Sequence, residues 1–541
     1  MSRSRQWRRW VAGAGLVPAL LLAACGDDDS SDDASGDVTT TVAGTGGGTA
    51  TTAPADDDVD PNGVLRIAFN FAASGGIHFD PIQQNSPADF QVHYHVYDTL
   101  LRQQEDGSYE PGLAKEAKVV DPHTITVTLQ EGVKFQDGTD LGSDDVIATI
   151  QRTIDANKPN AFRMAELSQV DTMTADSPTQ LTIKLKTPIA GSFYNLLAHN
   201  ETMPLSKDAI DSGNDFNTNP VGAGPFKLVS QDNQKIVLEK WDGYFQADQI
   251  KLAGVEWVQV DNASLVLALR SGTVDAAFTT IDINSQLEGS DVTTRSEPSP
   301  DNVYWMSLMC EVVPEFRDVR VRQALNFAVD KDAINQAAFA GKGTPMSQFW
   351  AVGSPFYDER LADAYDYDLD KAKALLAEAG ADDLRLRIPS TPGQQQRISE
   401  LLQAAWTEAG LQVEIVPVTN AVQEVYIDKR ADFFHTGQNR FWTDKITRTF
   451  LPGSIGTTCD PKDPAFTQMV ADLRAVDPGA PEAVDLWKQV SRYLSENAYG
   501  VWLVNGTVNN AYDGDRVGNP MWTPNQVGQF FPDVHKVYIK A

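Results

Sequence analysis

The succession of a strand, a helix and a second strand after Leu384 most strongly constrains the fold of this chain. The runs "LRLRIP" and, from Leu411, "LQVEIVPV" have the two-residue period of strands. Between them a helical spacing, ended by Gly410, places several apolar side chains on one face: Ile398, Leu401, Leu402, Ala405, Trp406 and Ala409. Two strands joined through a helix pair in parallel with a right-handed crossover. This region therefore predicts an α/β fold.

Shorter strand signals fill the first half of the chain. Four runs rich in Val, Ile and Thr have the same two-residue period: "TITVTLQ" at Thr124, "LTIKLK" at Leu181, "KIVLEK" at Lys235 and "VEWVQV" at Val255. Connections of turn length separate several of them, which favours an antiparallel or mixed sheet.

Two amphipathic helices are expected in the later half. "DLDKAKALLAEAG" has Asp368 or Asp370 placed to cap a helix and Gly380 to end it. In "DVRVRQALNFAVD" a stripe of small and apolar side chains faces a core, and the charged ones are left for solvent or salt bridges. The stripe is Val321, Ala324, Leu325 and Ala328, and the charged residues are Arg320, Arg322 and Asp330.

The amino terminus has the pattern of an export signal. Four arginines precede the apolar run from Val11 to Leu22, which is too short to cross about 30 Å of hydrocarbon comfortably as a helix. The run ends in Leu22-Ala23-Ala24-Cys25, which resembles the lipobox of bacterial lipoproteins. The resemblance implies that residues 1–25 are a lipoprotein signal peptide and that Cys25 is lipidated. An ordinary signal with an incidental cysteine is the alternative.

Residues 26–60 are expected to form a disordered acidic tether. They contain ten aspartates and only three sizeable apolar residues, so burial cannot offset the entropy of ordering them. The remaining 480 or so residues are too many for one hydrophobic core, which predicts two or more lobes. No later apolar stretch approaches transmembrane length, so we expect this body to be soluble.

Charge and cysteine content narrow the function and the compartment. The whole chain carries a formal charge of −30, and without the leader and the tether about −24 remains, which argues against nucleic acid as a partner. Besides Cys25 the chain has only Cys310 and Cys459. In an oxidising compartment we expect these two to form a disulfide, with two buried free thiols as the alternative.

Four blocks, in order, resemble the peptide/nickel family of solute-binding proteins that serve ABC importers. Together with the lipobox they cover nearly the whole chain. The blocks are "VYDTLLRQQEDGSYEPGLAKEAKVVDPHTITVTLQEGVKFQDGT" at Val96, "NPVGAGPFKLVS" at Asn219, "FRDVRVRQALNFAVDKDAI" at Phe316 and "YDLDKAKALLAEAG" at Tyr367.

The resemblance implies a two-lobed periplasmic-binding-protein-like fold, type II of the large peptide-binding class, with mixed sheets and a hinge. The larger lobe would comprise residues 61–300 plus 505–541, and the smaller lobe residues 301–504. The chain would cross between them near Val303 and near Val501. Two extended crossings can flex while both lobes stay rigid.

The resemblance also implies a function without covalent chemistry or a cofactor. The protein would be a monomeric receptor, lipid-anchored on the extracytoplasmic face of the cell membrane. It would capture a small organic solute and deliver it to an ABC permease and ATPase complex.

Candidate solute contacts come from three tracts, of which the first matches the family position where the chain approaches the ligand, the last lies in the predicted smaller lobe, and "GTPMSQFW" offers Trp350 as a wall. They are the loop "FNFAASGGIHFDP" after the first strand, "GTPMSQFW" and "HTGQNRFWTD". The residues selected are Ser74, Gly75, Gly76, His78, Trp350, Gln438, Arg440, Phe441 and Trp442.

The chain departs from the family pattern at one informative position. Peptide binders of this family commonly carry an aspartate that holds a peptide's ammonium, and here Phe441 occupies that place. Arg440 beside it favours a carboxylate or another acceptor. The solute is therefore left open between a peptide, an opine-like or anionic compound and an oligosaccharide.

A hydrolase and a receptor without transport function are alternatives to a solute receptor, and a metal site is a separate possibility. An anchored hydrolase is the first alternative: the chain has no G-x-S-x-G, H-E-x-x-H or phosphate-cradling loop, but scattered carboxylates can catalyse hydrolysis without such a motif. A surface receptor without transport function would have the same fold. A metal site at His93 and His95 requires a strand, because on a helix the two side chains diverge.

Overall fold

The computed structural model describes residues 58–541 apart from 72–75, 84–86, 105–107, 157–163, 420–421, 438–445, 447–449, 451–462, 521 and 525–529. The predicted signal peptide, Cys25 and most of the predicted tether lie outside these residues. The body begins slightly earlier than predicted, because Val59 forms a bridge with Lys540 and the Asp60 N–H donates to the Ile539 carbonyl over 2.8 Å.

Among the described residues, nine strands form a central sheet in the order β16-β12-β17-β11-β1-β10-β9-β8, with β13 beside β17. Strand β1 is parallel to β10 and β11, and the other pairs are antiparallel. The predicted mixed sheet is therefore confirmed. The strands are β1 (Val64–Phe69), β8 (Phe226–Gln231), β9 (Lys235–Lys240), β10 (Gly254–Gln259), β11 (Ala276–Phe278), β12 (Val292–Leu308), β13 (Thr344–Pro345), β16 (Phe433–Gly437) and β17 (Gly500–Asp513).

A second sheet is antiparallel and has the order β4-β5-β7-β6 among the described residues. Its strands are β4 (Ala114–Asp121), β5 (Thr124–Leu129), β6 (Val170–Ser177) and β7 (Gln180–Leu185). Helices α2 (Ser143–Ala156) and α4 (Ala190–Leu196) pack against this sheet.

Four strand pairs complete the sheets of the described residues. One of them, β14 (Arg385–Ser390) with β15 (Gln412–Pro417), is parallel and is joined through α11 (Gln394–Glu408), as the sequence predicts. The others are β2 (Leu101–Gln103) with β3 (Tyr109–Pro111), β18 (Val517–Gly518) with β21 (Tyr538–Ile539), and β19 (Trp522–Pro524) with β20 (Phe530–Pro532).

The remaining α-helices of the described residues have between 4 and 16 residues. In the part of the chain that the structure describes, none is both long enough and apolar enough to cross a membrane. They are α1 (Pro87–Val96), α3 (Met164–Leu167), α5 (Lys207–Asp211), α6 (Leu265–Arg270), α7 (Ile281–Leu287), α8 (Val319–Phe327), α9 (Lys331–Phe339), α10 (Leu369–Ala379), α13 (Pro464–Ala475) and α14 (Pro481–Glu496).

Helix α8 corrects one prediction about charged side chains. The stripe of Val321, Ala324, Leu325 and Ala328 is buried, as expected. The Arg322 side chain was expected in solvent or in a salt bridge, but it is buried. It donates to the Phe316 carbonyl and to the Asn497 carbonyl, each over 2.7 Å. Carbonyl acceptors therefore satisfy the guanidinium inside the core.

Two large apolar cores lie within residues 54–541, which form one unit. The first core gathers side chains from Leu65 to Ala276 and from Val517 to Ile539, and the second core gathers side chains from Ile281 to Val504. The parallel β14–β15 pair supplies Leu386 and Ile388 to the second core.

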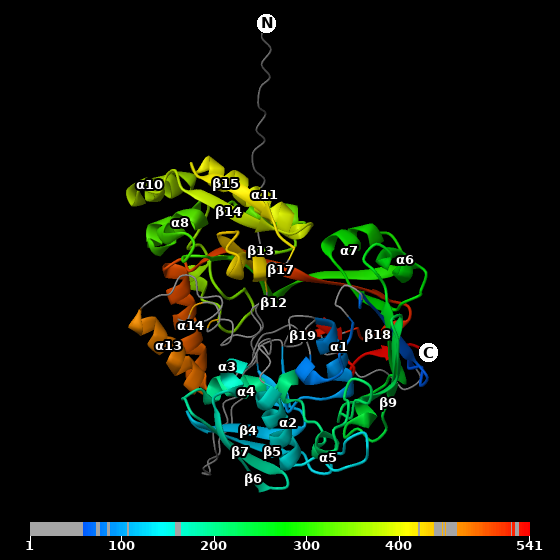
Figure 1. Cartoon of the computed structure of the whole chain (residues 1–541). Helices are drawn as coiled ribbons and strands as arrows, with labels where there is room; N and C mark the ends of the chain where they lie inside the picture. Colours follow the sequence, from blue (N-terminus) through cyan, green and yellow to red (C-terminus); the bar gives the residue numbers. More distant parts are fainter. Residues whose placement is uncertain are drawn as a thin grey trace, which may run out of the picture. The chain divides into compact units, whose positions relative to one another are not determined.

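The antiparallel ribbon of β12 and β17 runs through both cores (Figure 1). Its pairing is regular from Val292 opposite Asp513 to Pro298 opposite Thr507, and it resumes at Val303 opposite Asn505. Between these stretches residues 299–302 face only one residue of β17, Gly506. This β-bulge falls where the first core gives way to the second, and bulges bend and twist a ribbon locally.

Candidate functional site

A cavity of about 1110 Å³ opens at the carboxyl ends of β1 and β10. It is formed by the loop after β1, the turn between β8 and β9, and the start of α6. Its walls are Phe71, Gly76, Ile77, Asn217, Thr218, Gln231, Asp232, Asn233, Gln234, Gln259, Val260, Asp261, Ser264 and Ala268.

The strand directions place this cavity at the edge of the sheet that leads to the second core. Strand β11 is parallel to β1, and β12 follows through two successive antiparallel pairings, so β12 runs in the same direction as β1. Its continuation past Pro298 therefore leaves from the edge where the cavity lies. Ligands of open α/β sheets bind outside the carboxyl ends of parallel strands.

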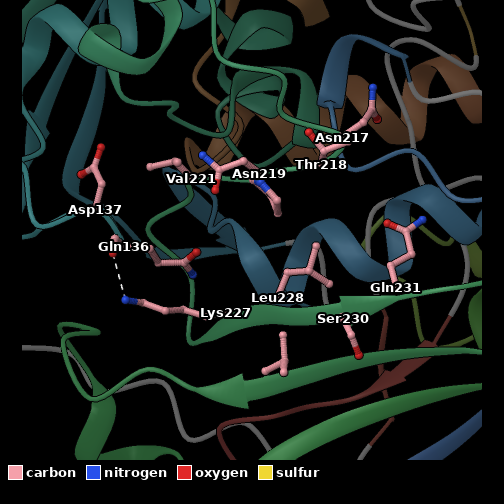
Figure 2. Close-up of a pocket in the computed structure, with 12 residues that line it drawn as sticks. Gln136, Asp137, Asn217, Thr218, Asn219, Val221, Lys227, Leu228, Ser230 and Gln231 are labelled. Atoms are coloured by element: carbon pink, nitrogen blue, oxygen red, sulfur yellow. Dashed lines mark hydrogen bonds between the residues drawn. The ribbon is translucent and has the colours of Figure 1, made fainter.

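A smaller cavity of about 450 Å³ adjoins the first and shares Asn217, Thr218 and Gln231 with it. Figure 2 shows Lys227, Leu228 and Ser230 along β8 on one side of this cavity. The Lys227 Nζ donates to the Gln136 carbonyl over 2.9 Å, and the Gln136 side-chain amide donates to the Phe226 carbonyl over 2.7 Å. Because these groups already bond within the protein, the larger cavity is the better candidate site.

Most of the side chains that line the larger cavity are polar, and two of them are acidic. Amide and hydroxyl side chains dominate, and the lining residues named above include two carboxylates and no lysine or arginine. Hydrogen bonds from the Gln234 and Lys235 N–H groups lower the pKa of Asp232, and a bond from the Ser264 N–H lowers that of Asp261. Both side chains are therefore ionised at neutral pH.

The loop that carries the predicted contacts contributes Gly76 to the wall. Gly76 has a φ of 104°, a left-handed conformation that glycine adopts at little cost. Ser74 and Gly75 lie outside the described residues. His78 lies two residues after Gly76, and its side chain is about 30% exposed.

Two buried side chains of α1 hold the backbone of His78 from both sides. Asp89 accepts the His78 N–H over 2.7 Å, and His93 Nε2 lies 2.7 Å from the His78 carbonyl oxygen. Burial lowers the pKa of His93, so the ring is neutral and donates its Nε2–H to that carbonyl. The two residues are four apart and therefore share one face of the helix. Helix α1 thus fixes the loop beside the cavity.

The same loop is also tied to the far wall of the cavity. The Asp80 carboxylate accepts two hydrogen bonds from Arg152, each of 2.8 Å, and the Asp80 N–H donates to Asn217 Oδ1 over 3.2 Å. Burial acts to raise the pKa of Asp80, but the bonds and charge of Arg152 outweigh it and lower the pKa. The ion pair is therefore intact at neutral pH.

The His93 and His95 rings have different surroundings. His95 packs against Phe226 and Trp257, with ring centroids 5.9 and 5.4 Å away. Among the described residues, no group of three or more His, Cys, Asp or Glu side chains is arranged to hold a metal ion. The His93 ring thus holds the loop beside α1, and the His95 ring packs against two aromatic side chains.

Of the remaining predicted contacts only Trp350 lies within the described residues, and it lines neither of the two cavities. Trp350 is buried in the second core, where its ring meets Phe356 and Trp487 at centroid distances of 5.0 and 5.2 Å. Its role as a wall of the solute site stays a prediction. Gln438, Arg440, Phe441 and Trp442 lie outside the described residues.

The cysteines are described only in part. Cys310 is buried and takes part in a disulfide. Cys459, its predicted partner, lies outside the described residues, so the pairing itself stays a prediction.

Several wall residues were not selected from the sequence. Gln259 and Val260 are the last two residues of the predicted "VEWVQV" strand, and Gln231 and Gln234 flank the turn before "KIVLEK". A polar residue at the carboxyl end of a parallel strand is a usable signal. It could have been applied only if β1 and β10 were known to pair.

Comparison with known proteins identifies the family. A sequence model of the bacterial extracellular solute-binding proteins, family 5 (middle region), matches residues 108–453. The glutathione-binding protein GsiB of Salmonella paratyphi A is 25% identical over 492 residues, which cover 87% of this chain and 93% of that protein.

Solved structures share the fold. The ABC transporter substrate-binding protein CtaP of Listeria monocytogenes superposes with a TM-score of 0.76 at 22% identity, over 88% of this chain and 99% of that one. The periplasmic binding protein DppA of Helicobacter pylori, in complex with the peptide STSA, has a TM-score of 0.73 at 20% identity, over 90% and 99%.

These comparisons confirm the predicted periplasmic-binding-protein-like fold of the peptide-binding class. The family match covers more than half of the chain, and its members capture solutes outside the cytoplasm. The chain therefore belongs to family 5 of the bacterial extracellular solute-binding proteins and is the solute-binding protein of an ABC importer.

Proposed function

We propose that this protein is a lipid-anchored receptor that closes two lobes on a small, polar, uncharged or positively charged solute and delivers it to its permease. The observation that carries the proposal is the cavity at the carboxyl ends of β1 and β10, on the edge that leads to the second core. A solute bound there lies where both cores can contact it.

The division into lobes is supported by the two cores and the bulge between them. The larger lobe comprises residues 61–300 and 505–541, and the smaller lobe residues 301–504. The bulge at residues 299–302 of β12 coincides with this boundary, so bending the ribbon there moves one core relative to the other. Only a solute that binds the closed form better can shift the population toward it.

The solute class is inferred from the cavity wall. Asp232 and Asp261 oppose an anionic solute, and the surrounding amides and hydroxyls suit amide or hydroxyl groups of the solute. An amidated peptide or an oligosaccharide therefore fits better than an opine-like anion. The sequence argument from Arg440 pointed the other way, toward a carboxylate. The experiment below decides between the two.

A thermal-shift series with four probes tests the solute class. The probes are maltotriose, trialanine amide, trialanine and reduced glutathione, which run from neutral through cationic and zwitterionic to anionic. A probe at about 100 times its Kd stabilises the native state by about 2.7 kcal/mol, which raises the melting temperature measurably. We expect maltotriose or trialanine amide to raise it more than glutathione does.

A matched pair of variants tests the place of binding. Gln259 lies on the cavity wall, whereas Gln468 is exposed on α13. We expect Gln259→Ala to reduce the shift and Gln468→Ala to leave it unchanged. Equal shifts in melting temperature in both variants would mean that the solute binds outside this cavity. A larger shift with glutathione than with the other probes would refute the inference that the cavity disfavours anions.

Lipid anchoring rests on the Leu22-Ala23-Ala24-Cys25 sequence alone. Expression of the full chain with radiolabelled palmitate should label the wild type, and Cys25→Ser should abolish the label and release the protein from the membrane fraction. Wild-type protein without label would refute the anchor.

A further inference from the structure

The two cores meet at a second place, formed by elements outside the β12–β17 ribbon. Helix α4, which packs on the antiparallel sheet, lies against the carboxyl end of α13 (Figure 1). A Cβ atom added to Gly191 of α4 would lie 1.8 Å from the carbonyl oxygen of Val476, the residue that follows α13. At this distance only a glycine permits the two backbones to approach.

A largely buried ion pair joins α13 to α3, which packs beside α4. Arg474, in the last turn of α13, places Nη2 3.7 Å from Glu166 Oε1, and its Nε donates to Ser192 Oγ over 3.3 Å. The side chain of Glu166 is 3% exposed and that of Arg474 is 20% exposed. A charge pair so withdrawn from water is costly to separate unless both groups are rehydrated.

The two sides also fit closely. The void between them measures only about 20 Å³, room for roughly one water molecule. It is lined by Tyr109 and Asn195 on the side of the first core and by Leu473, Val476 and Trp487 on the side of the second. The two surfaces are therefore packed as closely as those of a specific protein interface.

We propose that this contact is a clasp that sets the affinity for every solute without touching any of them. The clasp consists of Glu166, Gly191, Ser192, Arg474 and Val476. The inference rests on the proposed function, because it requires that the two cores separate and close. A contact made only in the closed form adds to the free energy of closing, so it scales the affinity for all solutes by one common factor.

The most direct test is the Gly191→Leu variant, whose larger side chain blocks the contact between α4 and the end of α13. The added side chain cannot fit against the Val476 carbonyl when the cores are closed. In the open form it replaces glycine by a good helix former, which favours α4. We expect the Kd for each probe that binds the wild type to rise by the same factor, about tenfold. The melting temperature without solute should not fall.

A second variant removes the ion pair without inserting atoms. Arg474→Ala should raise the Kd for the same probes in common proportion, and Arg474→Lys should restore part of the affinity because it keeps the charge. Gln468→Ala, on the exposed side of the same helix, is the control and should bind like the wild type. Small-angle scattering with a saturating probe should show a smaller decrease in the radius of gyration for Gly191→Leu and Arg474→Ala than for the wild type.

The outcomes separate the two proposals. If no probe binds or contracts the wild type, the proposed function fails and the clasp falls with it. If probes bind the wild type and both clasp variants equally well, the function stands and the clasp is refuted. A loss confined to one probe would also refute it, because that pattern means direct contact with the solute. Should Gly191→Leu fail to fold by circular dichroism, Arg474→Ala alone decides.

Discussion

At the scale of single residues, the second core buries positive charge against neutral oxygen atoms. Lys331 is 7% exposed, and its Nζ donates to the Tyr365 carbonyl over 2.8 Å and to Ser347 Oγ over 3.2 Å. Burial lowers the pKa of Lys331 to about 7. Like Arg322, this side chain contributes hydrogen bonds to the core at the cost of desolvating its charge.

The pKa of Lys331 predicts a pH-dependent contribution to stability. Between pH 7 and 10.5 the unfolded chain binds a proton at this lysine that the folded protein has lost, so stability from this group rises with pH. We expect the difference in the free energy of unfolding, wild type minus Lys331→Met, to increase as the pH rises through this window. The gain should be on the order of 1 kcal/mol per pH unit.

Urea unfolding at pH 7, 8, 9 and 10 measures this difference. Lys342→Met, at an exposed lysine of the same region, is the matched control and should follow the wild type. A constant difference between wild type and Lys331→Met over the whole window would contradict the assignment.

Residue-level prediction failed where a position depends on distant partners, and the selected solute contacts stay predictions. The glycine-rich loop after the first strand pointed to Gly76, which lies on the cavity wall. Arg322 was misplaced because its acceptors, such as the Asn497 carbonyl, are far away in the sequence. Helical periodicity reports which face is apolar, but it cannot report a buried guanidinium that is fully hydrogen-bonded.

At the scale of elements, local signals fixed the helices well. The sequence left Asp368 and Asp370 as alternative caps of α10, and the structure selects Asp368, whose Oδ1 accepts the Lys371 N–H over 2.9 Å. Gly380 ends the helix with a φ of 67°, as predicted. The β14–α11–β15 unit was likewise predicted, because its strand and helix periods alternate within a short stretch.

The cap assignment can be tested with its own internal control. Asp368→Ala should lower the free energy of unfolding by about 1 kcal/mol, the usual effect of losing a side-chain cap. Asp370→Ala removes a carboxylate of the first turn that does not cap the helix. It should therefore lower the free energy of unfolding by only a few tenths of the loss caused by Asp368→Ala. Chemical denaturation of both variants provides the comparison, and equal losses would argue against Asp368 as the cap.

At the scale of the whole molecule, the pairing of strands that are distant in the chain could not be predicted from the sequence. The order of the central sheet joins β11 to β17 and β12 to β16, partners more than a hundred residues apart. Strand periods show that a segment is a strand, not which strand it meets. The large cavity depends on another such pairing, that of β1 with β10, so most of its wall could not be chosen in advance.

The disulfide of Cys310 is a second long-range link. If its partner is Cys459, Cys310→Ser and Cys459→Ser should each lower the free energy of unfolding by roughly 2–5 kcal/mol. The double variant should lose no more than either single one, because both substitutions remove the same bond.

A peptide map without reductant identifies the pair directly. We expect one linked peptide containing Cys310 and Cys459, and its disappearance after reduction. An unchanged stability of Cys459→Ser would exclude this pairing.

Because β12 and β17 pair with each other, the second core is arranged like a domain inserted into the first. Apart from Ile281, the side chains of that core lie between Val303 and Val504. Val303 and Asn505, at the two ends of this stretch, are opposite each other in the ladder, so entry and exit lie about one strand spacing of 4.8 Å apart. A module with adjoining ends can be exchanged between relatives as one piece, or closed into a circle by a short linker. Recombination at these two positions offers a way to change what is captured while leaving the remainder of the receptor intact.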